Sequence, residues 1–229
     1  MGIRHQRNSN LVLIEGQDCW EGLPVQTKCG PLAIPYLKRM RETILAAVGE
    51  YPRTLAIRFD VRFPKDYKGS YTAVISRFIE SLKAILKADE IRRAREGKRV
   101  HPCRLRYFWV KEWSKSHHWH YHVCIFLNAD AYFTLGLFKK GSDEANGDTE
   151  GSRNMADRIK QALSSALGLS KEESKGLVHF PMNPTYRINK RCSCWEEEFA
   201  ELFHRVSYFA KADTKRYGDN SKHFSCSRG

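Results

Sequence analysis

Two consecutive segments rich in aromatic and β-branched residues restrict the possible folds of this chain more than any other feature. They span residues 105–113 and 119–127, and the polar residues 114–118 separate them. Segments of this length and composition, joined by a short polar connection, are typical of an antiparallel β-hairpin. We therefore expect a sheet that contains this hairpin.

Hydrophobic periodicity predicts the elements around the hairpin. Apolar residues recur at three- and four-residue steps in four segments and alternate with polar residues in one. The expected helices span 35–48, 70–95, 155–167 and 195 to about 216, and the expected strands 54–63 and 177–180. After the first helix the order is β-α-β-β-α-β-α, which indicates an α+β fold of the split β-α-β type, an antiparallel sheet with helices packed on one face.

The rest of the chain suggests one domain with two irregular segments. Residues 1–33 are basic and interrupted by glycine and proline, so we expect an irregular N-terminal arm. Residues 34–229 then form a single domain, and the polar, glycine-rich stretch at about 139–154 is expected to be a mobile loop within it.

The second segment of the hairpin contains a candidate metal site. Side chains alternate across a strand, so His120 and His122 project from the same face, close enough to bind one ion. If the hairpin turns near Ser116, Glu112 lies about opposite His120 and supplies a third ligand. Two imidazoles and a carboxylate suit Mg²⁺ or Mn²⁺, with Zn²⁺ possible by affinity. The alternative is that these histidines are only the polar face of a half-exposed strand.

The last expected helix carries a candidate nucleophile. Its apolar residues form one stripe, and Tyr208 points nearly opposite that stripe, with His204, Lys211 and Lys215 on its side. Neighbouring ammonium groups favour phenolate and hold phosphate, so Tyr208 could attack phosphorus. The alternative is a surface tyrosine whose ring covers a neighbour.

Charge and cysteine content bear on partner and compartment. The formal net charge of +13 favours a polyanionic partner but does not choose among DNA, RNA and an anionic membrane. Seven scattered cysteines suit reduced thiols, no secretory pattern opens the chain, and no apolar run approaches the roughly 18 residues of a membrane span. We therefore expect a cytoplasmic protein without a membrane partner.

Six short strings, in order, resemble the inovirus-type replication initiators of the HUH endonuclease superfamily. The resemblance covers about residues 35 to 229, and any one string alone is weak. The strings are LAIRFDVRFP (55–64), WVKE (109–112), HYHV (120–123), GLVHFP (176–181), SYFAKADTK (207–215) and HFSCSR (223–228).

The resemblance implies a rolling-circle initiator of a phage or related element, which nicks one strand of a replicative form and becomes joined to its 5′ phosphate. His120 and His122 match the metal pair, Glu112 the acidic ligand, Tyr208 the nucleophile and Lys211 its accompanying lysine. Some relatives have a second tyrosine at the position of Lys211, so this chain resembles a single-tyrosine enzyme. Its size leaves little room for a helicase, so a host helicase and replication machinery are expected partners.

Two other functions remain open from the sequence. A non-catalytic module that binds single-stranded nucleic acid would use the same basic sheet. Phosphate contacts in either case are expected from Lys215, Arg58, Arg62, Arg104 and Arg106. A relaxase or transposase would use the same chemistry on another substrate.

Overall fold

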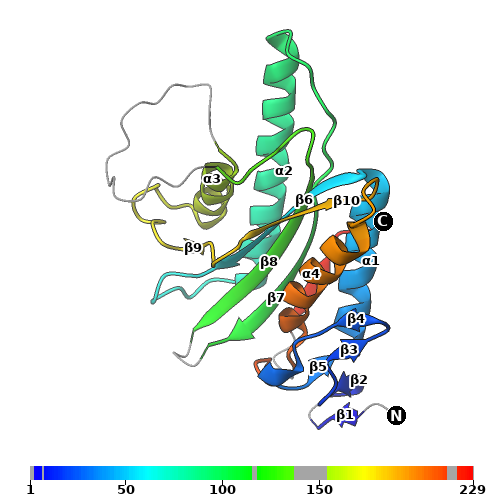
Figure 1. Ribbon diagram of the computed structural model, residues 1–229. Coiled ribbons are helices and arrows are strands. Elements are labelled where there is room, and N and C mark those ends of the chain that lie inside the picture. Colours follow the sequence, from blue (N-terminus) through cyan, green and yellow to red (C-terminus); the bar gives the residue numbers. More distant parts are fainter. Residues whose placement is uncertain (1–2, 7, 115–117, 137–153, 216–220, 229) are drawn as a thin grey trace.

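The fold is mixed α+β and is built on a largely antiparallel sheet (Figure 1). The computed structural model describes residues 3–6, 8–114, 118–136, 154–215 and 221–228. The strand order is β10-β6-β8-β7-β11, and β9 also pairs with β6. These strands are β6 (Arg53–Val61), β7 (Arg106–Trp113), β8 (Trp119–Asn128), β9 (Val178–His179), β10 (Thr185–Asn189) and β11 (Phe224–Cys226).

Helices cover both faces of this sheet, which corrects the prediction that all of them pack on one face (Figure 1). Among the described residues the α-helices are α1 (Ile34–Glu50), α2 (Tyr71–Arg95), α3 (Met155–Leu167) and α4 (Trp195–Ser207). Ile57 and Phe59 belong to one hydrophobic core with α2 and α3, whereas Ala56 belongs to another with α1 and α4. The sequence of β8 agrees with burial on both faces. Residues 123–127 form an unbroken apolar run, whereas a strand with one solvent-exposed face would alternate apolar and polar residues.

The predictions of the hairpin and of the first three helices are confirmed, with local signals that explain the boundaries of α2 and α3. The Ser70 hydroxyl caps α2 by accepting a hydrogen bond from the backbone of Ala73. Asn154 caps the start of α3, and Gly168 ends that helix in the left-handed conformation, at φ 69°. In the hairpin, Glu112 of β7 lies directly opposite His120 of β8, as the sequence predicted.

The N-terminal segment is folded, so the prediction of an irregular arm is wrong. It contains two small sheets and one 3₁₀ helix, in which Trp20 and Leu32 are buried against the α1 and α4 core. Its elements are β1 (Ile3–His5), β2 (Asn8–Ile14), β3 (Cys19–Trp20), β4 (Leu23–Pro24), η1 (Thr27–Cys29) and β5 (Leu32–Ala33). Glycine and proline here separate very short strands, which periodicity does not detect.

The last helix is shorter than predicted. It ends at Ser207, and residues Tyr208–Ala210 form the 3₁₀ helix η2. Lys211 then becomes extended, forms a bridge with Leu32, and is followed by a hydrogen bond from the Ala212 amide to the Pro31 carbonyl at 2.9 Å. Pairing with the N-terminal segment therefore replaces the last turns of the expected helix.

Three other predictions have different outcomes. No helix in the described parts of the chain is both long and apolar enough to cross a membrane. The expectation that every cysteine is a thiol is corrected, because Cys192 and Cys194 form a disulfide while the other five cysteines are free. The mobile loop predicted at about 139–154 lies outside the described residues, apart from Asn154.

Candidate metal centre and adjoining tyrosine

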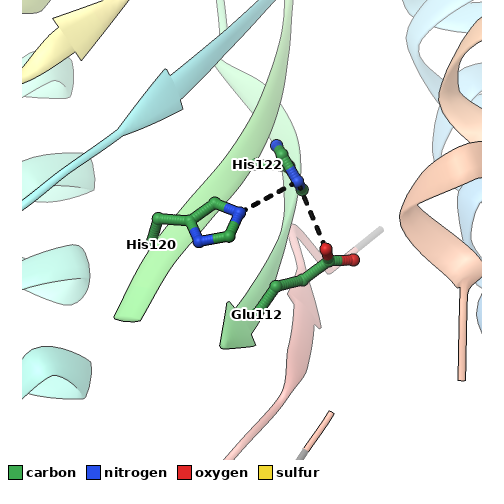
Figure 2. A group of neighbouring side chains, drawn as sticks. All are labelled: Glu112, His120 and His122. Carbon is green, nitrogen blue, oxygen red and sulfur yellow. Dashed lines mark hydrogen bonds and ion pairs between the residues drawn. The ribbon is translucent and has the colours of Figure 1, made fainter. Parts of the chain in front are cut away.

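The hairpin brings the three predicted ligands together (Figure 2). His122 Nε2 lies 3.3 Å from His120 Nε2 and 3.4 Å from Glu112 Oε2, and one ligand atom from each residue lies within 4.8 Å of the others. Ligands held at about 2.1 Å from one cation lie roughly 3.0 to 3.4 Å apart in octahedral or tetrahedral geometry. The three side chains therefore fit a single divalent cation.

A fourth residue, Asp60, orients His122. Its Oδ1 lies 2.6 Å from His122 Nδ1, and Asp60 is directly opposite His122 in the pairing of β6 with β8. A metal-binding histidine commonly donates its second ring N–H to a carboxylate, which fixes the tautomer that leaves the other nitrogen free. Burial alone would raise the pKa of Asp60, but the hydrogen bond and charge of His122, together with Arg58, hold this pKa at about 2.

The charges around the site shift the pKa values of the two imidazoles in opposite directions. Burial and the charge of His122 lower the pKa of His120 to about 4, so His120 is neutral at pH 7. Burial also acts against protonation of His122, but Asp60 and Glu112 raise the pKa of this histidine above its ordinary 6.5. A cation bound by His122 would take the place of a proton on Nε2, the nitrogen that faces Glu112, while Nδ1 stays bonded to Asp60.

The carboxylate of Glu112 interacts with three basic side chains, those of His122, Lys211 and Lys215. Burial raises the pKa of its carboxyl, but His122 and the two lysines outweigh that and hold the pKa well below its usual range. Lys215 Nζ lies 3.3 Å from Glu112 Oε1 and Lys211 Nζ lies 3.6 Å from Oε2. Glu112 therefore stays ionised and available to a cation.

Tyr208 lies beside the candidate metal ligands. Its ring centroid is 5.7 Å from that of His122, and the neighbouring Phe209 stacks on His122 at 5.2 Å. Lys211 Nζ lies 3.7 Å from the centre of the Tyr208 ring, where a cation interacts favourably with an aromatic ring. The phenol is half-buried, and Arg58 is near enough to interact with it electrostatically. The residues predicted to act together are thus adjacent in space.

Lys215 occupies a different place from the one predicted for a DNA contact. It is fully buried and bonds to Glu112, to the Phe209 carbonyl at 3.0 Å and to the Lys211 carbonyl. Burial lowers the pKa of Lys215 to about 8, with Glu112 acting in the opposite direction. Lys215 therefore fixes Glu112 and the segment after Tyr208, and the prediction that it lies on a DNA-binding surface is corrected.

The four predicted arginine contacts separate into two kinds. Arg58 and Arg106 are buried: Arg58 lies 3.5 Å from Asp60, and Arg106 pairs with Glu50 at 2.7 Å, away from the metal ligands. Their alternation on the expected strands led to the prediction of exposed side chains, but both faces of this sheet are covered. Arg62 and Arg104 are exposed, as a phosphate contact requires.

Sequence reasoning missed Asp60 and His179. His179 Nδ1 lies 3.5 Å from Asp60 Oδ2, and Asp60 pairs with both histidines across the sheet. Both residues lie within strings that carried the resemblance, but only the strand order places them next to His122. An acidic residue at an otherwise buried strand position was the available signal.

The chain belongs to the YagK/YfjJ C-terminal domain family, whose model matches residues 18–227. Similar proteins include the uncharacterized protein YagK of Escherichia coli strain K12, 33% identical over 204 residues that cover 85% of this chain and 93% of the relative. The uncharacterized protein YfjJ of the same strain is 32% identical over 205 residues, 85% of this chain and 94% of the relative. No solved structure matches the chain.

Proposed function

We propose that this chain is a metal-dependent, single-tyrosine DNA endonuclease and strand transferase of the HUH type that initiates rolling-circle replication of a phage or related element. The observation that carries the proposal is the convergence of Tyr208 and Lys211 on Glu112, His120 and His122. Burial of charged groups costs free energy, so packing alone does not account for a cluster of charged and polar side chains on a buried strand.

The arrangement of secondary structure supports the same proposal. The strand order β10-β6-β8-β7, with α2 and α3 on one face, is that expected of a split β-α-β core. In the proposed enzyme, α1, α4 and the N-terminal segment are additions on the second face. They hold the segment after Tyr208 against the metal ligands.

The proposed reaction is a transesterification. The Tyr208 oxygen loses its proton to water and forms a bond to phosphorus, the bond from phosphorus to the 3′ oxygen breaks, and the 3′ oxygen leaves as a hydroxyl after taking up a proton from water. Lys211, above the ring, stabilises the phenolate that forms as Tyr208 loses its proton. A bound Mg²⁺ or Mn²⁺ would supply Lewis-acid stabilisation of the phosphate charge. Religation reverses these steps, and in the bacterial cytoplasm a host helicase and polymerase would act between them.

A denaturing gel with labelled single-stranded DNA and Mn²⁺ tests the proposal. A DNA–protein band that survives denaturation is expected for the unaltered protein, and no such band for Tyr208→Phe. Tyr186→Phe is the matched control, because this half-buried phenol also interacts with Arg58 but lies on β10. The absence of an adduct with every metal would count against the nuclease and favour the non-catalytic binding module. An adduct that persists in Tyr208→Phe excludes this nucleophile.

A further inference from the structure

A basic groove lies on the molecule away from the metal ligands. It has a volume of about 640 Å³ and lies between α2 and the strands β7 and β11. Four of its lining residues are basic and one is acidic: Lys83, Lys87, Arg104 and Arg228, with Glu90. A concave surface of one charge sign concentrates ions of the opposite sign, so this groove suits an anionic ligand.

Two of these cations are free to bind such a ligand. Arg104 and Arg228 are exposed, and neither has an ion-pair partner among the described residues. Lys83 and Lys87 pair with acidic neighbours on α2, at 2.8 and 3.1 Å, but these pairs are exposed and weak. Guanidinium groups bind phosphate oxygens in a bidentate manner. The groove thus offers to phosphate two guanidinium groups that have no ion-pair partner in the described part of the chain.

The groove also contains an aromatic surface. Tyr107 lines it, is half-buried, and has Lys83 Nζ at 6.0 Å from its ring centre. An aromatic ring among cations is the combination on which nucleic-acid bases stack while the backbone is neutralised. Inorganic phosphate has no use for such a ring, so the ring favours a nucleic-acid ligand.

The groove and the candidate metal ligands lie on opposite sides of the sheet. Tyr107 and Glu112 are five residues apart on β7, so their side chains point to opposite faces, and Tyr107 packs on the core of α2 and α3. We propose that this groove binds the phosphate backbone of single-stranded DNA, as a site separate from the metal centre. Binding in the groove does not rest on the function proposed above.

Fluorescence anisotropy with labelled (dT)₃₀ in the presence of chelator tests the groove independently of cleavage. The test variant is Arg104→Glu with Arg228→Glu. The matched control is Lys38→Glu with Arg191→Glu, which changes the charge equally at exposed residues outside the groove. Loss of two phosphate contacts lowers affinity for single strands about 25-fold at 0.1 M salt and reduces the slope of log K against log salt by about 1.4.

The control is expected to keep its affinity within about threefold and to retain the salt slope. Equal losses in the two variants would overturn the proposal, because they would reflect overall charge alone. Competition by dTMP is the second measurement. If dTMP binds as tightly as (dT)₃₀, and the groove variant but not the control no longer binds dTMP, the groove is a mononucleotide site and the DNA proposal is wrong. If no adduct is ever found but groove-dependent (dT)₃₀ binding persists, the nuclease proposal alone fails.

Discussion

Removal of the Asp60 carboxylate should weaken metal binding without touching a metal ligand. The carboxylate accepts a hydrogen bond from His122 at 2.6 Å, so it fixes the ring with Nε2 towards Glu112 and increases the basicity of that nitrogen. Asp60→Ala removes both effects, whereas Asp60→Asn keeps an acceptor oxygen but loses the negative charge. The two substitutions therefore separate orientation from charge.

Loss of such an outer carboxylate typically lowers metal affinity 10- to 100-fold, which equals about 1.4 to 2.7 kcal/mol. We expect Asp60→Ala to fall in this range for Mn²⁺, measured by isothermal titration calorimetry, with Asp60→Asn between it and the unaltered protein. Asp130→Asn is the control, since that carboxylate pairs with Arg53 at 2.5 Å and has no contact with the candidate ligands.

Stability must be measured alongside affinity, because Asp60→Ala also leaves the buried Arg58 without its carboxylate. Urea unfolding shows whether a variant is folded at the temperature of the titration. If folded Asp60→Ala binds Mn²⁺ as tightly as the unaltered protein does, Asp60 does not position His122 and the reasoning is refuted.

Three further outcomes are expected. The pKa of His122 is higher in the folded protein than its value of 6.5 in the unfolded chain, so protonation of His122 stabilises the metal-free protein fully below pH 6.5. This stabilisation is lost as the pH rises through the folded pKa. Urea unfolding midpoints measured in chelator should therefore fall over that pH range, and Mn²⁺ should restore them. Lys215→Met should cost about 3 to 5 kcal/mol in urea unfolding because it leaves Glu112 buried with one fewer cation; an unchanged midpoint would contradict the buried pair. Deletion of residues 1–33 should abolish the cooperative unfolding transition measured by circular dichroism, because Trp20 and Leu32 of this segment are part of the core that contains α1 and α4. An intact transition would support a separable arm.

The candidate ligands could be predicted because they depend on local geometry. A strand has a period of two, and a short hairpin pairs residues at equal distances from its turn, so Glu112 opposite His120 follows from a few assumptions. The position of Tyr208 near these residues followed from the resemblance, since periodicity only placed it on the side of a helix away from the core.

The remaining errors arose where distant segments meet. Asp60 acts on His122 only because β6 lies next to β8, an order that local patterns do not specify. The end of α4 depends on pairing between Lys211 and Leu32, which are far apart in the sequence. The burial of Arg58 and Arg106 depends on helices packing over both faces of the sheet, and alternation within one strand does not reveal the second layer.

Identification of the residue joined to DNA tests the central proposal most directly. The protein is incubated with Mn²⁺ and labelled single-stranded origin DNA, and the denatured adduct is digested and sequenced by mass spectrometry. We predict a 5′-phosphate on Tyr208, formed only with metal and absent from His120→Ala with His122→Ala. An adduct on another residue, or one that forms equally in chelator, would contradict the proposed site.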